Sequence, residues 1–120
     1  MKQSIENKSF LFSVRVVKLC RYLQEEKREY ILSKQLLRCG TSIGANVTES
    51  QQAQSRADFI SKLSIALKEA SETNYWLRLL NATEYLSESE FSSIIADCKE
   101  IERILTSIIK TTRNTLKKSH

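Results

Sequence analysis

The chain has 120 residues, and its 19 Lys and Arg against 14 Asp and Glu give a net charge of +5. It contains no proline and two glycines, where average usage would give about six and eight. It therefore lacks the frequent turns that sandwiches, barrels and βαβ folds require.

No segment approaches the roughly 18 consecutive apolar residues of a membrane span. The apolar stretch from Phe10 to Val17 is broken by Ser13 and Arg15, and no small-residue cleavage site follows it, so we read no signal peptide. We expect one domain over residues 1–120, located in the cytoplasm and without membrane contact.

The first predicted helix covers about residues 4–26. Its apolar residues recur at steps of 4, 3 and 4, which is the spacing of one helix face. The stripe consists of Phe12, Val16, Leu19 and Leu23, flanked by Phe10, Val14 and Val17.

The second predicted helix covers about residues 33–54 and contains both glycines, Gly40 and Gly44, one turn apart. Each glycine costs about 1 kcal/mol relative to alanine inside a helix. We therefore expect either the close approach of another backbone or a bend. The apolar stripe consists of Leu36, Cys39, Ile43 and Val47.

The third predicted helix covers about residues 58–81 and carries a heptad seam with small residues at its centre. Small residues let a neighbouring helix come near, and we expect that neighbour to be the glycine face of the second helix. The expected core positions here are Phe59, Leu63, Ala66, Ala70 and Leu77.

The fourth predicted helix begins after Ser87, which forms a capping-box pattern with Glu90, and ends near Thr112. Residues 113–120 are expected to form a basic flexible tail. Together the elements predict an all-α, up-down-up-down antiparallel four-helix bundle. Apolar residues beyond one stripe per helix are candidates for subunit contacts: Ile60, Leu67, Ile95 and Ile109.

A polar line on the second helix joins residues at steps of 4, 4 and 3, and it has two interpretations. It is either a partly buried network that fixes subunit register, as a buried Asn does in coiled coils, or an ordinary solvated face. Its members are Arg38, Ser42, Asn46 and Glu49.

The adjacent aromatic residues Tyr75 and Trp76 point about 100° apart on a helix. One is expected in the core and the other at a subunit contact, where such residues are enriched. The alternative is stacking on nucleic-acid bases.

Cations concentrate on the first predicted helix and in the C-terminal segment. They are either a phosphate-binding surface or ordinary solubilising charge. The candidate phosphate contacts are Lys8, Arg15, Lys18, Arg21, Lys110, Arg113, Lys117 and Lys118.

Catalytic and cofactor motifs are missing. The chain has no glycine-rich phosphate loop, no Glu-x-x-His pair, and its single histidine, His120, is the last residue. This composition argues against a zinc site, a His-based triad and a disulfide framework. We predict a protein without catalysis, metal or cofactor, whose Cys20, Cys39 and Cys98 act as small buried hydrophobes.

Four sequence blocks carry a family resemblance that covers about residues 10–110. They are LLRCGTSIGANVTE (36–49), SRADFI (55–60), LSIALKEA (63–70) and ETNYWL (72–77). They resemble the bacterial four-helix-bundle family named for proteins encoded in 23S rRNA intervening sequences. That family includes the accessory protein of diversity-generating retroelements.

The resemblance implies a homo-oligomer, specifically a pentamer, without known catalysis. For the retroelement members it also implies binding to a reverse transcriptase and nucleic acid. The leading hypothesis is a nucleic-acid-associated adaptor that binds RNA or DNA, or a reverse transcriptase or other protein. The alternatives are a protein–protein scaffold with incidental charge and, more remotely, a small-molecule-binding bundle.

Overall fold

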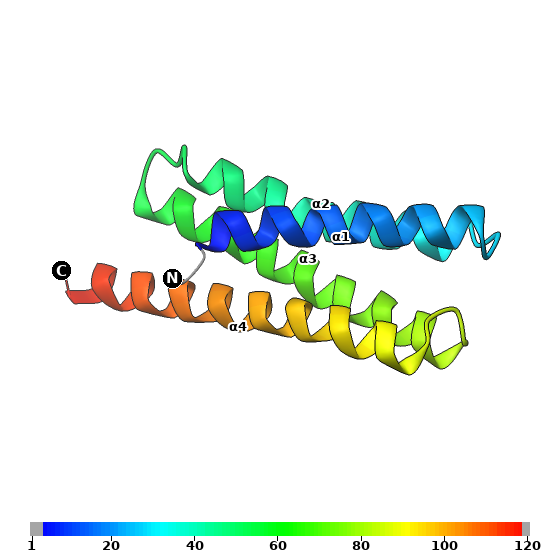
Figure 1. Ribbon diagram of the computed structural model, residues 1–120. Coiled ribbons are helices and arrows are strands. Elements are labelled where there is room, and N and C mark those ends of the chain that lie inside the picture. The colour runs from blue at the N-terminus through cyan, green and yellow to red at the C-terminus, as the bar shows by residue number, and fades with distance from the viewer. Residues whose placement is uncertain (1–3, 119–120) are drawn as a thin grey trace.

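The computed structural model describes the backbone of residues 4–118 and the side chains of residues 4–115. It contains four helices: α1 (Ile5–Glu25), α2 (Leu32–Ser50), α3 (Arg56–Ala82) and α4 (Glu88–Lys118). Each helix runs antiparallel to the one before it (Figure 1). No strand occurs within the described backbone, so the predicted all-α four-helix bundle is confirmed.

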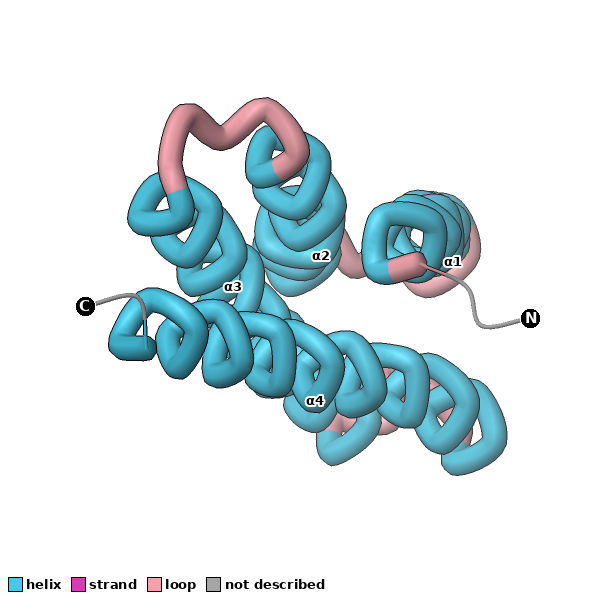
Figure 2. The backbone as a smooth tube through the Cα atoms, turned by 90° about the vertical axis from the view of Figure 1, so that its left-hand side faces the viewer, coloured by secondary structure: helices cyan, strands magenta, loops and turns pink. Residues whose placement is uncertain are grey.

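The four helices form an elongated bundle of 54 × 26 × 22 Å. Figure 2 shows α2 between α1 and α3, with α4 running along the side away from α2. Consecutive helices pack closely together, whereas the backbones of α1 and α4 approach each other at few places. The α1–α4 boundary is therefore the loosest in the bundle.

Side-chain caps set the starts of three helices. Ser4 caps α1 and Ser55 caps α3, each accepting a hydrogen bond from a backbone N–H three residues later. Ser87 and Glu90 form the predicted capping box: Glu90 N donates to Ser87 Oγ at 3.2 Å, and Ser87 N donates to Glu90 Oε1 at 2.9 Å. These bonds satisfy N–H groups that a helix start leaves without partners.

Glu29 lies before α2 and caps the start of this helix. Its carboxylate accepts hydrogen bonds from the backbone N–H groups of Ile31, Leu32 and Ser33, at 3.1, 2.9 and 2.7 Å. Only 8% of its surface is exposed. Burial acts to raise the pKa of Glu29, but these donors outweigh it and lower the pKa. The sequence analysis missed this residue because it lies in a charged link without a helix-cap spacing.

The core follows the predicted stripes closely. Leu63, Ala66, Ala70 and Leu77 are buried as expected, while Phe59 is only partly buried and packs against the core edge. All three cysteines are buried and carry free thiols. Three of the expected subunit-contact positions, Ile60, Ile95 and Ile109, are instead buried within this chain, and Leu67 packs against the core. Their helices need a broader apolar face than one stripe because each packs against two neighbours.

The glycines of α2 pack against α1, not α3, so the predicted partner was wrong. A Cβ atom at Gly44 would lie 3.2 Å from the carbonyl oxygen of Ser9, and Gly40 lies against Val16. The predicted close approach of another backbone is thus confirmed. α2 meets α3 on its other side, where Thr73 Oγ1 lies 3.2 Å from the Sγ of Cys39.

Helix ends differ from prediction at two places. α2 stops at Ser50 rather than near Gln54, because Ser55 caps the next helix and the intervening residues form the turn. α4 continues through Lys118 rather than stopping near Thr112. The C-terminal segment contains no glycine or proline to end the helix, and its cations suit the negative end of the helix dipole.

Candidate nucleic-acid interface

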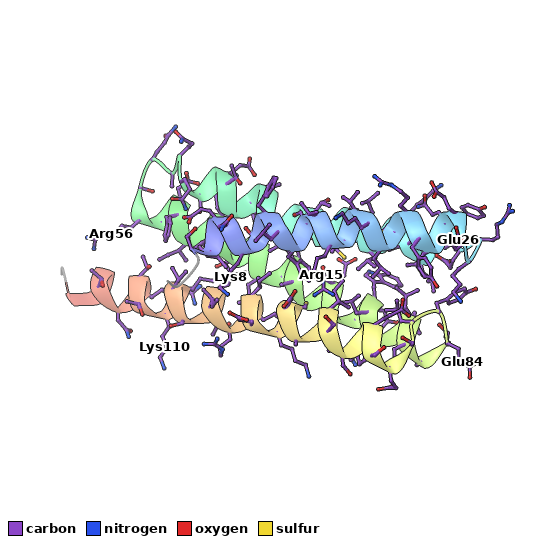
Figure 3. All side chains as sticks on the ribbon, viewed as in Figure 1. Lys8, Arg15, Glu26, Arg56, Glu84 and Lys110 are labelled. Carbon is purple, nitrogen blue, oxygen red and sulfur yellow. The ribbon has the colours of Figure 1, made fainter. Side chains whose placement is uncertain are left out.

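Lys8 and Arg15 reach from α1 to acidic residues of α4. Lys8 Nζ lies 2.6 Å from Glu100 Oε1, and Arg15 Nη1 lies 2.6 Å from Asp97 Oδ2. In Figure 3 both labelled side chains point toward α4. Lys8 lowers the pKa of Glu100 through this hydrogen bond and its charge. The charges of these two candidate phosphate contacts are therefore balanced inside the chain.

The two ion pairs flank an open cavity of about 360 Å³ between α1 and α4. Its apolar lining comes from Leu11, Phe12 and Val14 of α1 and from Ile101 of α4. Leu11 is 44% exposed there. The cavity follows from the sparse contact between these helices.

Lys18 and Arg21 are exposed on the side of α1 that faces away from the core. They border a hollow of about 310 Å³ whose walls are almost wholly apolar. Phe10 is 65% exposed and Val17 is 37% exposed beside it. We call this surface the α1 outer face: Phe10, Val14, Val17, Lys18 and Arg21. It joins apolar side chains and cations on one helix side.

α4 carries a second set of exposed cations. Lys110 and Arg113 were predicted, and Lys99 and Arg103 were missed. Steps of 4, 7 and 3 along the helix place all four on one side. None of the four has an ion-pair partner in the part of the chain whose side chains are described. Lys117 continues the same spacing, but the side chains of Lys117 and Lys118 lie outside the described residues.

Two acidic residues of α4, Asp97 and Glu100, lie on a different side from these cations. Asp97 and Glu100 face α1, where Arg15 and Lys8 bind them, although Arg103 also contributes to the lowered pKa of Glu100. Lys110, by contrast, points away from the bundle in Figure 3. The ion pairs thus draw negative charge into the α1–α4 boundary and leave positive charge on the opposite side of α4.

Side chains of α3 extend this surface. Glu102 of α4 accepts hydrogen bonds from Asn74 Nδ2 at 3.0 Å and Ser71 Oγ at 3.3 Å. Asn74 Oδ1 in turn accepts from Arg78 Nε at 2.9 Å, and the Arg78 guanidinium lies 5.9 Å from the ring centroid of Tyr75. We call the combined surface the α3–α4 face: Tyr75, Arg78, Lys99, Arg103, Lys110 and Arg113.

Trp76 and Tyr75 lie in different surroundings. Trp76 packs against the core and donates from Nε1 to Glu72 Oε2 at 2.9 Å. Tyr75 is 49% exposed, and its ring meets that of Trp76 edge-on with centroids 5.1 Å apart. One residue therefore points inward, as predicted, and the other is available at the surface.

The polar line of α2 faces α3 within the chain. Arg38 binds Glu72 and lies 3.4 Å from Glu69, while Glu49 lies 3.9 Å from Lys62.

Asn46 donates from Nδ2 to the backbone oxygen of Ser42 at 2.9 Å and to its hydroxyl at 3.1 Å. The ion pairs of Arg38 and Glu49 connect α2 to α3 near both ends of the line.

Comparison with known proteins identifies the family. A family model described as "23S rRNA-intervening sequence protein" matches residues 1–107. The chain belongs to the 23S rRNA-intervening sequence protein family. The family resemblance carried by the four sequence blocks between residues 36 and 77 is therefore confirmed.

A solved structure is similar to this chain over most of its length. It is the crystal structure of a protein with unknown function from the S23 ribosomal protein family of Bacteroides thetaiotaomicron VPI-5482. The two share 56% sequence identity with a TM-score of 0.88, covering 89% of this chain and 99% of that one. No curated protein matches the chain.

Reactive groups are scarce among the residues that the structure describes. Burial raises the pKa of all three thiols, to about 12 for Cys20. The described residues contain no group of three or more metal-binding side chains. Within the same residues, no helix is long and apolar enough to cross a membrane. The surface features that stand out are therefore the two cationic faces.

Proposed function

We propose that this protein is a non-enzymatic, homo-oligomeric adaptor that associates with nucleic acid in the cytoplasm. The observation that carries this proposal is the separation of charge on α4. Two of its acids, Asp97 and Glu100, are held by α1, while four of its cations remain exposed on another side. Exposed cations without acidic partners attract phosphate groups by releasing counterions.

Self-association is supported by the α1 outer face. Phe10, at 65% exposed, and Val17 border an apolar hollow, and exposed apolar clusters of this kind mark contact surfaces. A second copy of the chain is the proposed occupant, in a pentamer as the family resemblance implies. Five copies of a chain with net charge +5 would sum to about +25, which attracts polyanions over a distance.

RNA, or a reverse transcriptase bound to it, is the proposed partner by the same family resemblance. The alternative function is a protein–protein scaffold whose charge is incidental. It is favoured by Ile31 and Tyr30 at the turn between α1 and α2, which are 76% and 48% exposed. A protein partner would bury such residues.

Two measurements test the proposal together. Sedimentation velocity should show an oligomer for the wild type and a smaller species for Phe10→Glu, while Ile31→Glu, an exposed control, keeps the oligomer. Fluorescence anisotropy with labelled RNA and DNA across a salt series should show log affinity falling linearly with log salt. A stable oligomer that binds neither ligand at low salt would instead support the scaffold function.

A further inference from the structure

We infer that the α3–α4 face binds the backbone of single-stranded nucleic acid, with Tyr75 as a stacking platform for an unpaired base. This inference rests on the proposed function and assigns its ligand class and surface. It selects one of the two cationic faces over the other. It also gives a role to Lys99, Arg103 and Arg78, which the sequence patterns did not single out.

The cations of α4 form a row along the helix. Lys99, Arg103, Lys110 and Arg113 share one side of a continuous helix and are all exposed. From Lys99 to Arg113 the helix rises about 21 Å, at 1.5 Å per residue. A row of this length can contact several successive phosphates of one strand.

Cations outnumber acids on this face. Glu102 keeps its negative charge here, because its hydrogen-bond donors Asn74 and Ser71 are neutral. Asp97 and Glu100, the other acids of this stretch of α4, are paired with cations of α1. The four exposed cations of α4 therefore face one unpaired carboxylate, and the face keeps a net positive charge.

An exposed aromatic ring lies beside Arg78. Tyr75 is half exposed, and Arg78 lies next to its ring while bonding to Asn74. Proteins that bind single strands combine a cationic track with exposed aromatic rings, because each unpaired base offers a face for stacking. A duplex keeps its bases stacked internally and offers no such face to Tyr75.

The α1 outer face is the other cationic surface that could bind nucleic acid. Lys18 and Arg21 border exposed Phe10 and Val17 on the α1 outer face. If a second copy covers that apolar surface, it also restricts access to these two cations. The α3–α4 face has mainly charged and polar side chains exposed, so it stays open in an oligomer built through α1.

The charge test compares two triple variants that each remove three positive charges. One is Lys99→Gln, Arg103→Gln and Lys110→Gln on α4. The other is Lys18→Gln, Arg21→Gln and Lys34→Gln on α1 and α2, where all three residues are exposed. Circular dichroism and sedimentation confirm that each variant keeps the wild-type fold and subunit number.

Affinity for a labelled single-stranded oligonucleotide, as RNA and as DNA, is measured against salt. The α4 triple should flatten the slope of log affinity against log salt by about 2, at roughly 0.7 per phosphate contact. The α1–α2 triple should leave the slope nearly unchanged.

The stacking test compares two tyrosines with nearly equal exposure. Tyr75, at 49% exposed, is changed to Ala, and the control is Tyr30→Ala, at 48%. Tyr75→Ala should weaken single-strand binding by roughly five- to a hundredfold, as expected for one stacked base. It should leave the affinity for a duplex of the same length unchanged, and Tyr30→Ala should change neither.

Other results would overturn either the assignment to the α3–α4 face or the proposed function. If the α1–α2 triple flattens the slope as much as, or more than, the α4 triple, the assignment to the α3–α4 face is overturned while the proposed function stands. The same holds if Tyr75→Ala and Tyr30→Ala behave alike. If the wild type binds neither single strands nor duplex at low salt, the proposed function fails, and this inference fails with it.

Discussion

A Cβ atom on Gly40 would lie 2.8 Å from Cγ1 and 2.9 Å from Cγ2 of Val16, closer than side chains normally approach. Val16 is fully buried and its side chain is stiff about χ1, so it cannot move aside cheaply. This contact explains why α2 tolerates a glycine in its interior. Glycine lowers the helix propensity of α2, but the missing side chain allows α1 and α2 to pack at short range.

Gly40→Ala should therefore destabilise the protein. Overpacking costs about 1–3 kcal/mol, and the gain in helix propensity returns about 1 kcal/mol, so we expect a net loss of up to about 2 kcal/mol in urea denaturation. In the double variant with Val16→Ala, the loss of unfolding free energy should be about 1 kcal/mol smaller than the sum of the losses in the two single variants. Strict additivity would show that these residues do not compete for space.

Glu29→Gln should lower stability at neutral pH by about 1–2 kcal/mol, as for loss of a helix cap. The folded state lowers the pKa of Glu29, so its contribution is complete above its ordinary value of about 4.3. That contribution is lost as pH falls through the lower, folded-state pKa. Urea denaturation at neutral and acidic pH should show the two proteins converging on acidification. The variant Glu26→Gln serves as the control. If the difference in stability between the wild type and Glu29→Gln persisted in acid, the carboxylate of Glu29 would not be the helix cap.

Replacing both members of the Arg15–Asp97 pair, as Arg15→Gln with Asp97→Asn, leaves the net charge unchanged. Both side chains are substantially exposed, at 39% and 45%, and exposed pairs contribute roughly 0–1 kcal/mol. The unfolding free energy should change by less than about 1 kcal/mol. The salt slope of nucleic-acid binding should stay as in the wild type. A flatter slope would show that Arg15 leaves Asp97 to contact phosphate.

The three cysteines should resist thiol reagents in the folded protein. Burial raises the pKa of Cys20 to about 12, against an ordinary value of about 8.5. Its reactive thiolate is therefore much scarcer at neutral pH than that of an exposed cysteine. Titration with a colorimetric disulfide reagent should show slow reaction in native buffer and rapid reaction of all three thiols in guanidinium chloride. Fast labelling of the native protein would mean that the core opens readily.

Regular spacing made most of the fold predictable. The stripes containing Val16, Ile43, Leu77 and Leu105 lie in the core, because burial repeats with the period of the helix. The Ser87–Glu90 cap was predictable for a similar reason, since it depends on residues three apart. Glu29 was not predictable, because its cap depends on the path of a short link.

The candidate site was less accessible to sequence analysis. Lys8, Arg15, Lys18 and Arg21 look alike in the sequence, yet two are bound to α4 and two are exposed. Only the packing of α1 on α4 decides which cations are paired with acidic residues. The same packing decides that Ile60, Ile95 and Ile109 are core residues rather than surface ones.

The sequence by itself determined the number and type of elements, the core stripes and the family, because all of these depend on local spacing or shared residues. The tertiary structure alone decided which helix faces the glycines, which acids neutralise which cations, and which apolar residues remain outside. Those properties depend on the distances between residues far apart in the chain. Lys8 and Glu100, 92 positions apart in sequence, are neighbours only because α1 and α4 lie side by side.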